Sequence, residues 1–221
     1  MKNYFLQCIF LMPILFVSCK KESKSNSCNT ENVTDIDGNV YEVVSIGNQC
    51  WMKQNLKVTK FKNGDPIFLV TGNSSWANTQ QTAYCYYNND LQNGAKYGKI
   101  YNGIAVNDPR GIASDGWRVP NKNDWNELFN YLGGYKIAGK SMKVTGDGNF
   151  GQINTGTNAS GFSALPGGNR VGNTGTFAVG GTWAVFWGTN AYSFYITDYE
   201  DYAYGGSSLI SNGCSVRLIK E

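Results

Sequence analysis

The feature that most constrains the fold is one stretch, residues 115–134 (DGWRVPNKNDWNELFNYLGG), which contains the complete signal for a helix. Asn121 is a good N-cap, and the carboxylate of Asp124, three residues later, can accept hydrogen bonds from free backbone N–H groups. Pro120 stands just before the cap, where its ring blocks helical extension upstream. Two glycines at the end of the stretch supply a left-handed stop. The stretch therefore predicts a helix of about three turns that begins after Asn121.

Apolar residues within this helix mark the face that it buries. They follow the i, i+3, i+4, i+7 spacing of an amphipathic helix that covers one side of a sheet. We expect the two tryptophans of the segment TWAVFWGT to pack behind the same helix. The residues expected in the core are Trp117, Trp125, Leu128, Phe129, Leu132, Trp183 and Trp187.

The remainder of the chain is rich in residues typical of strands and turns. Aromatic residues make up 14% of the sequence and charged residues 16%, and 27 residues are Gly. This composition suits short strands and tight turns better than a helical bundle. Turn signals at Asp37-Gly38 and Gly47-Asn48 bracket a strand over 40–46, and several short strands are expected from residue 162 onward. The net charge is only +3 and no basic stripe stands out, so nucleic acid is not an expected partner.

The N-terminus has the features of an export signal. A short positive region precedes an apolar run over 4–17 that is too short to span a bilayer. The run ends in VSC, which resembles the lipobox of bacterial lipoproteins, where the cysteine is acylated and becomes the new N-terminus. We therefore expect a signal peptide over 1–18, and a lipidated Cys19 with a flexible tether over 19–32 that holds the protein on a membrane. An ordinary secretory signal is the alternative.

Four cysteines remain in the mature chain, namely Cys28, Cys50, Cys85 and Cys214. An even number of cysteines in an exported protein favours disulfides. Their irregular spacing and the lack of His in the sequence argue against a zinc site, so no metal is expected. Three pairings are possible, and we choose the nested one, Cys50–Cys85 with Cys28–Cys214.

Seven segments of the mature chain stand in a recognisable order, namely DIDGNVYEVVSIGNQCWMKQNL, KYGKIYN, DGWRVPNKNDWNELFNYLGG, AGKSMK, SGFSALPGGNR, WAVFWGT and GCSVRLIKE. Their order and spacing resemble those of the Fibrobacter succinogenes major paralogous domain. This family occurs in exported proteins and lipoproteins of Fibrobacteres and Bacteroidetes. The resemblance implies a single domain over 33–221, on a protein of the outer membrane or cell surface.

A more distant similarity concerns the fold. WRVPNKNDWNEL resembles the helix start of formylglycine-generating enzymes, and GCSVRLIKE resembles their C-terminal end. Those enzymes have a variant of the C-type-lectin fold. The similarity implies an α+β domain of that type, with a small, twisted, mostly antiparallel sheet, one main capped helix and long loops. It also implies that the first and last strands, starting at Val33 and ending at Ile219, lie side by side.

Catalysis has little support in the sequence. The chain has no His, which removes Ser-His-Asp and Cys-His nucleophile systems and His-ligated metals. Nothing matches the cysteine pair with which formylglycine-generating enzymes bind copper, so that activity is not carried over. Asp198, Glu200 and Asp201 could serve a carboxylate-dependent hydrolase, but a solvated loop is the more ordinary explanation. We expect a protein that is not an enzyme and needs no cofactor.

Aromatic residues after residue 182 form the candidate binding site. The segment GTWAVFWGTNAYSFYITDYEDYAYGG combines flat rings with Asn, Asp and Gly, a mixture that suits sugar rings or an adaptable protein contact. An exposed aromatic row would favour a binding module for a polysaccharide or a surface protein. A fully buried set would favour a structural or assembly component of the cell envelope. The candidate ligand-binding residues are Tyr195, Tyr199, Tyr202, Tyr204, Asp198 and Asp201.

Overall fold

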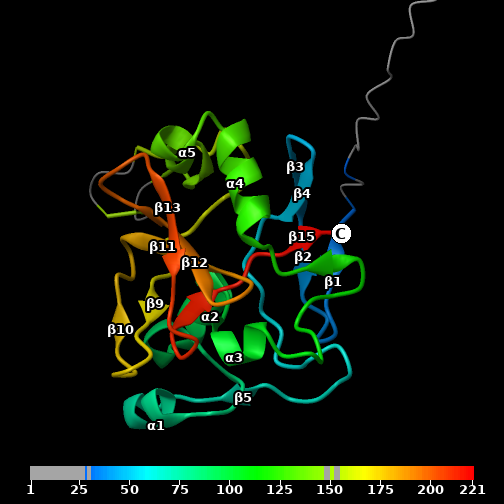
Figure 1. Ribbon diagram of the computed structural model, residues 1–221, viewed down its shortest axis with the longest axis vertical. Coiled ribbons are helices and arrows are strands. Elements are labelled where there is room, and N and C mark those ends of the chain that lie inside the picture. Colours follow the sequence, from blue (N-terminus) through cyan, green and yellow to red (C-terminus); the bar gives the residue numbers. More distant parts are fainter. Residues whose placement is uncertain (1–27, 29–30, 147–149, 152–154) are drawn as a thin grey trace, which may run out of the picture.

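The computed structural model describes residues 28, 31–146, 150–151 and 155–221. The predicted signal peptide, Cys19 and most of the predicted tether lie outside these residues. The described part is an α+β arrangement of three sheets with five α-helices (Figure 1). Within the same residues, none of the helices combines the length and apolar character that crossing a membrane requires.

The helices are α1 Asn73–Asn78, α2 Leu91–Tyr97, α3 Gly103–Val106, α4 Lys122–Tyr131 and α5 Tyr135–Met142, with a short 3-10 turn at Tyr87–Asn89. The strands before α4 are β1 Val33–Thr34, β2 Val40–Tyr41, β3 Val43–Ile46, β4 Gln49–Met52, β5 Phe68–Leu69, β6 Ala83–Cys85, β7 Ile100–Asn102 and β8 Trp117–Arg118. The strands after α5 are β9 Asn169–Arg170, β10 Phe177–Ala178, β11 Trp183–Gly188, β12 Tyr192–Thr197, β13 Ala203–Ser207, β14 Gly213–Ser215 and β15 Ile219–Lys220.

Helix α4 begins and ends as the sequence predicts. The Asn121 side chain accepts hydrogen bonds from the backbone N–H groups of Asn123 (2.7 Å) and Asp124 (3.2 Å). The Asp124 carboxylate accepts one in return from the Asn121 N–H at 2.7 Å, which completes a capping box. At the other end, Gly133 and Gly134 have positive φ and bond back to carbonyls of the last turn. The predicted capped helix is confirmed.

A second helix, α5, follows α4 directly, so the prediction of one main helix is wrong. Gly134 occupies its N-cap and offers no capping side chain, so the sequence has no N-terminal helix signal here. The apolar side chain of Ile137 is 52% exposed, so the apolar residues of the segment do not mark one buried face. A Cβ atom at Gly139 would lie 2.6 Å from the carbonyl oxygen of Tyr202. Glycine at this position therefore lets α5 lie directly against the start of β13. The buried residues of α5 are Ala138, Gly139 and Met142.

The largest sheet carries most of the core, and its strands run in the order β13-β12-β11-β14-β7-β6-β5. Side chains alternate between the two faces of β11, so Ala184 and Phe186 pack with the residues of α4. Trp183 and Trp187 point to the opposite face, and the prediction that they pack behind the helix is wrong. Trp187 is buried on that opposite face, where its indole N–H donates to the Tyr101 carbonyl at 2.7 Å. Trp183 is only half buried.

The other predicted core residues lie in two clusters on either side of this sheet. On α4, Trp125 and Leu128 are fully buried and Phe129 is 6% exposed, whereas Leu132 is half buried at the margin of the same cluster. Trp117 on β8 is 8% exposed and belongs to the cluster on the other side, together with Trp187. The large sheet therefore has side chains packed against both of its faces.

A four-stranded sheet joins the two ends of the domain, in the order β3-β4-β15-β8. Ile219 on the last strand pairs antiparallel with residues of both β4 and β8. The expected contact between first and last strands therefore involves the β3–β4 hairpin and not Val33, whose strand pairs with β2. The strand expected over 40–46 is divided at Glu42. The predicted Gly47-Asn48 turn closes the β3–β4 hairpin.

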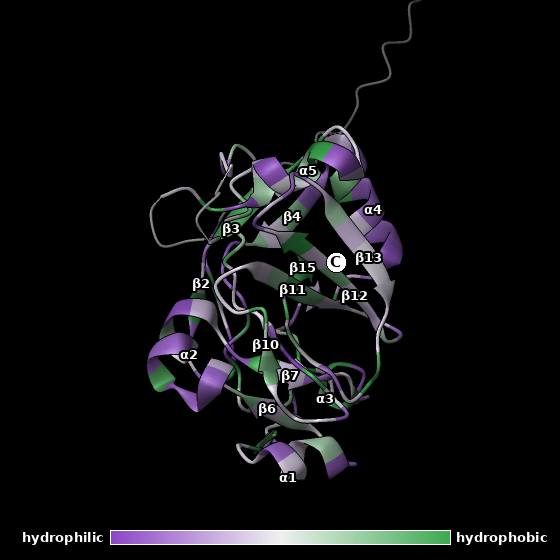
Figure 2. Ribbon diagram, turned by 90° about the vertical axis from the view of Figure 1, so that its left-hand side faces the viewer, coloured by the Kyte–Doolittle hydropathy of each residue, from purple (hydrophilic) through white to green (hydrophobic). Residues whose placement is uncertain are grey.

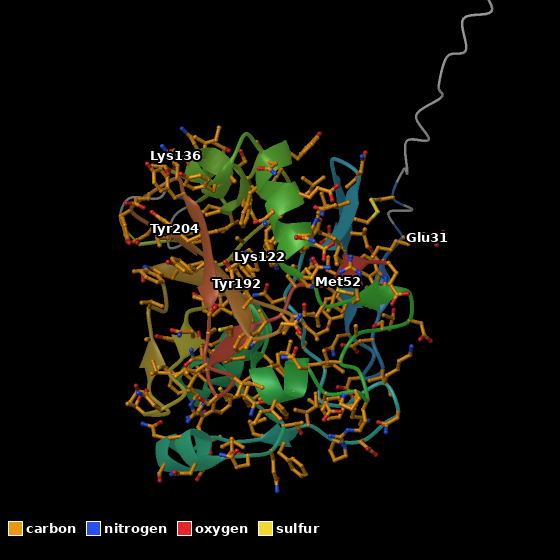
Figure 3. The ribbon with its side chains drawn as sticks, viewed as in Figure 1. Glu31, Met52, Lys122, Lys136, Tyr192 and Tyr204 are labelled. Atoms are coloured by element: carbon orange, nitrogen blue, oxygen red, sulfur yellow. A yellow bond between two sulfur atoms is a disulfide. The ribbon has the colours of Figure 1, made fainter. Side chains whose placement is uncertain are left out.

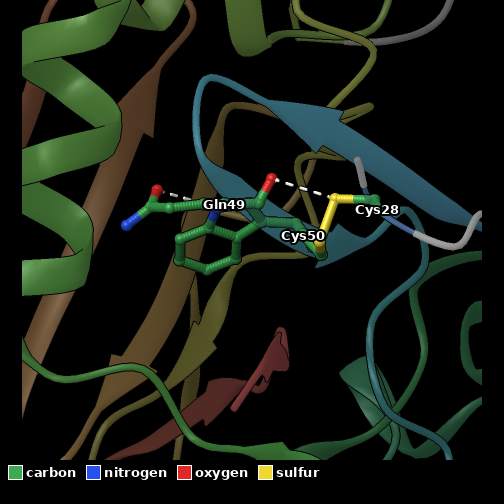
Figure 4. Close-up of a disulfide and its surroundings, with 4 residues drawn as sticks. Cys28, Gln49 and Cys50 are labelled. Carbon is green, nitrogen blue, oxygen red and sulfur yellow. Dashed lines mark hydrogen bonds between the residues drawn. A yellow bond between two sulfur atoms is a disulfide. The ribbon is translucent and has the colours of Figure 1, made fainter. Parts of the chain in front are cut away.

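Among the residues that the structure describes there is one disulfide, between Cys28 and Cys50 (Figure 4). The predicted nested pairing is wrong, because Cys85 and Cys214 are free and buried. These two residues lie on β6 and β14, which are separated by β7. Cys214 is opposite Tyr101 in the register and Cys85 is opposite its neighbour Ile100, so the two thiols point to opposite faces of the sheet. They cannot approach each other without a change of register.

Candidate binding face

Three neighbouring strands of the large sheet carry aromatic rings on the face turned away from α4. Tyr195 on β12 lies opposite Tyr204 on β13 in the register. The ring centroids of Trp183 and Tyr195 are 5.1 Å apart with an interplanar angle of 10°, and those of Tyr195 and Tyr204 are 5.1 Å apart at 19°. Tyr202 extends the series, 5.6 Å from Tyr204 and tilted by 49°. We call these four residues the aromatic row.

Every ring of the aromatic row is half buried. Because the rings of Trp183, Tyr195 and Tyr204 stand nearly parallel, they cover much of one another's faces, and a flat ligand has little room to stack between them. Tyr199 differs: it is 57% exposed and has no aromatic partner among the described residues. Figure 3 shows Tyr204 on β13, at the side of the molecule. The row and Tyr199 together, which we call the aromatic face, are neither fully buried nor fully open.

Tyr199 belongs to the connection between β12 and β13. The buried side chain of Lys143 holds the backbone of this connection by hydrogen bonds. The Lys143 side chain is fully buried, and its ammonium donates to the carbonyl oxygens of Thr197 (3.2 Å) and Glu200 (2.8 Å) and to the Thr155 hydroxyl (3.1 Å). All three of its donors are thus used. Burial lowers the pKa of Lys143, and nearby carboxylates of the connection partly offset this. The buried cation fixes the backbone that presents Tyr199.

The three acidic residues of this connection have different partners. The Tyr204 hydroxyl donates to the Glu200 carboxylate, which raises the pKa of Tyr204. Asp201 accepts a 2.5 Å hydrogen bond from the Thr155 hydroxyl and lies 3.8 Å from the Lys143 ammonium. Asp198 is half buried. Glu200 and Asp201 therefore support the loop, and the acids supply acceptors for polar ligands.

The sequence indicated the tyrosines of this face but neither the place of Trp183 beside Tyr195 nor the role of Lys143. Strict alternation along TWAVFW places Trp183 on the same face as Val185, and Tyr195 on the neighbouring strand shares that face. The two-residue period of a strand could therefore have predicted that Trp183 and Tyr195 lie on one face. Lys143 gave no such signal, because a lysine at the end of a helix usually remains in solvent. Its role depends on the fold of segments more than fifty residues away.

Other cavities lie away from the aromatic face. Two adjoining cavities of about 350 Å³ and 670 Å³ share Lys62, Ile112 and Ala113 as lining residues. The cations around them are compensated, since Lys62 pairs with Asp115 and Arg118 with Asp124. No member of the aromatic face lines either cavity. In the described part of the chain, no group of three or more Cys, Asp or Glu residues is arranged to hold a metal ion.

Comparison with protein families matches residues 44–220 to the Fibrobacter succinogenes major domain. No curated protein sequence matches the chain, and no solved structure does. The match covers most of the β3–β4 hairpin, α4, α5, the strands of the aromatic face and all of β15. The chain belongs to the Fibrobacter succinogenes major domain family.

Proposed function

We propose that this protein is an exported, lipid-anchored and non-catalytic binding module, and that its aromatic face contacts a glycan. The observation that carries the proposal is the half-exposed aromatic row beside Tyr199, whose ring is 57% exposed. A free aromatic ring next to carboxylates and hydroxyls offers a stacking surface and hydrogen-bond acceptors to one sugar ring at a time. Lys143 holds the connection in place, so that less conformational entropy is lost when a ligand binds.

The proposed anchor is Cys19, and the proposed location is the outer membrane or the cell surface. The apolar run that ends in VSC supports export and acylation. The Cys28–Cys50 disulfide supports an oxidising compartment outside the cytoplasm. A diacylated or triacylated cysteine would provide a stable anchor where a single chain would not.

The absence of catalysis is part of this proposal. The chain lacks His altogether, and burial raises the pKa of the free Cys85 thiol to about 11, which leaves it a poor nucleophile at neutral pH. Glu200 and Asp201 are engaged by Tyr204 and Thr155. A carboxylate-dependent hydrolase would need two acids poised across a cleft, and neither of these contacts favours that use.

We infer that the domain is a variant of the C-type-lectin-like fold. The position of β15 between β4 and β8, which brings the two ends of the domain together, supports this inference. The pair α4 and α5 beside the large sheet is also in keeping with it. Superposition of an experimental structure on C-type-lectin-like domains will test it, and a different order of the terminal strands would contradict it.

A second candidate function is that of a structural component that contacts another envelope protein. It is favoured by β13, which is the last strand of the large sheet. Its sequence AYGGS has neither a charged residue nor a proline, the usual devices that keep an edge strand from pairing. In this case the protein has no diffusible ligand.

A glycan array separates the two functions. Residues 20–221 are applied as wild type and as Tyr199→Ala, with Tyr131→Ala as the control, because Tyr131 is 65% exposed and lies on α4. We expect the wild type and Tyr131→Ala to bind the same glycans and Tyr199→Ala to lose them. Binding to no glycan, with one envelope protein recovered by cross-linking at β13, would support the structural role instead.

A further inference from the structure

A smaller cavity lies beside the C-terminal end of α2. Its volume is about 260 Å³, which suits one sugar ring or one amino acid. We call it the α2 pocket. Its lining residues are Glu42, Lys53, Gln54, Asn55, Lys57, Ala95, Lys96, Gly98, Val144, Ser163 and Leu165.

The lining contains three lysines and a single carboxylate. Glu42 is fully engaged: its two oxygens accept hydrogen bonds from Lys53 (2.9 Å) and Gln54 (3.0 Å). Lys57 and Lys96 make no ion pair with any described residue. The pocket therefore has two positive charges in excess.

Lys57 has hydrogen-bonding capacity to spare. Its ammonium donates to the carbonyl oxygen of Ala95 at 3.1 Å, which accounts for one of three N–H donors. This bond also satisfies a carbonyl at the end of α2 and holds the ammonium at the rim of the pocket. The Lys96 ammonium lies 4.9 Å from the centroid of the Tyr97 ring, a contact that leaves its donors free.

Arg217, directly behind the pocket wall, adds a third cation to Lys57 and Lys96, again without an ion pair among the described residues. Arg217 is fully buried, and its guanidinium donates to the side-chain oxygen of Asn55, a lining residue, at 2.7 Å and 3.0 Å. It also donates to the carbonyl oxygen of Phe162, next to the lining residue Ser163. No carboxylate of the described residues forms an ion pair with it. Burial lowers the pKa of Arg217 to about 9, so the group is still charged at neutral pH.

We propose that the α2 pocket binds a carboxylate carried by a ligand of single-residue size. An anion there would lie among Lys57, Lys96 and the charge of Arg217, in a partly enclosed space where screening by water is reduced. A uronic acid and an acidic amino acid carry the same group at a similar size. Figure 2 shows α2 and β13 on opposite sides of the molecule, so this site and the aromatic face are separate, and either can exist without the other.

The test is an NMR titration of ¹⁵N-labelled residues 20–221 with three small probes. D-galacturonate and N-acetylglutamate carry the carboxylate from the two sources, and D-galactose is the neutral match. We expect one or both acids to shift the amide signals of Ala95, Gly98 and Ser163 in a saturable manner, more weakly at high salt. The acid that binds identifies the source.

Variants assign the binding to the lysines. Lys57→Gln with Lys96→Gln should weaken binding of the acid by about tenfold or more, since charge-assisted hydrogen bonds are lost. Lys57→Arg retains the charge and should retain binding. Lys136→Gln, an exposed lysine of α5, should change affinity by less than about twofold. The proposal is overturned if neither acid binds, if galactose shifts the same signals equally, or if the double glutamine variant binds as the wild type does.

Discussion

At the scale of single residues, Trp125 has no exposed surface and lies among five aromatic rings. Its ring stacks on Phe194 at 4.8 Å and contacts Trp51 at 4.9 Å, and the others are Phe129, Phe162 and Phe186. Trp125→Ala should lower the free energy of unfolding by about 3–5 kcal/mol, as for other deleted core aromatics. Asn121→Ala should cost only about 0.5–2 kcal/mol, because it removes the cap and leaves the apolar face intact.

Urea denaturation of both variants, with Tyr199→Ala as an exposed aromatic control, measures these differences. Tyr199→Ala should lie within about 0.5 kcal/mol of the wild type. If Tyr199→Ala proves as destabilising as Trp125→Ala, the connection between β12 and β13 is core and not a ligand surface.

The cysteines provide a second test at this scale. Cys85 and Cys214 are buried, and burial raises the pKa of both thiols, so neither should react with a thiol reagent in the native protein. Residues 20–221, denatured without reductant, should then titrate as two thiols, and peptide mapping should recover Cys28 linked to Cys50. Titration of no thiol after denaturation would contradict the single disulfide of this structure.

At the scale of elements, the start of α4 is tied to the four-stranded sheet through Asp124. Arg118 on β8 donates two hydrogen bonds to the Asp124 carboxylate, at 2.6 Å and 2.7 Å. Burial by itself would raise the pKa of Asp124. The hydrogen bonds from Arg118 and from the Asn121 N–H outweigh this effect, so the pKa lies below its ordinary value. The carboxylate therefore stabilises the fold fully above its ordinary pKa of 3.8, and this contribution is lost as the pH falls through the folded-state pKa.

Asp124→Asn tests this link. The variant should melt below the wild type at pH 7, and the gap between the two melting temperatures should narrow between roughly pH 5 and pH 2 as the wild-type carboxylate is protonated. Glu127→Gln, an exposed acid on the same helix, is the control and should leave the pH profile unchanged. A gap of constant size from pH 7 to pH 2 would show that the charge of Asp124 contributes nothing.

Elements were predictable from the sequence where their signals are local. The capping box of α4, its glycine stop and the Gly47-Asn48 hairpin each lie within a few residues, and the structure has all three. Helix α5 and strand β13 were not predicted, because they are held by contacts with each other, as at Gly139 and Tyr202. The pairing of Cys28 with Cys50 likewise depends on where β4 lies, and spacing along the chain carries no such information.

At the scale of the whole molecule, the start and the end of the domain lie together. The Cys28–Cys50 disulfide fastens the beginning of the described chain to β4, and β4 pairs with β15 close to the C-terminus (Figure 1). If Cys19 is acylated, only eight residues lie between it and Cys28, a reach of at most about 30 Å. The end of the domain that contains the four-stranded sheet is then the end nearest to the membrane.

Cys19→Ala tests the anchor. In the native host the variant should leave the membrane fraction or accumulate as a precursor with an uncleaved signal peptide, because no acyl acceptor remains. Fractionation and intact mass of wild type and variant decide this. Ser25→Ala, a substitution in the predicted tether that leaves VSC intact, serves as the control and should stay in the membrane fraction. An unchanged distribution and an unchanged mass for Cys19→Ala would contradict lipidation.

We propose that the aromatic face is a ligand surface, separate from the residues that hold the fold together. Isothermal titration calorimetry with the best-binding glycan of the array measures the affinity of the wild type, Tyr199→Ala and Tyr131→Ala. The three proteins are first shown to have equal melting temperatures. Tyr199→Ala should weaken binding by about tenfold or more, a loss of ~1.4 kcal/mol, and Tyr131→Ala should change it by less than about twofold. Equal affinity of Tyr199→Ala and wild type would contradict it.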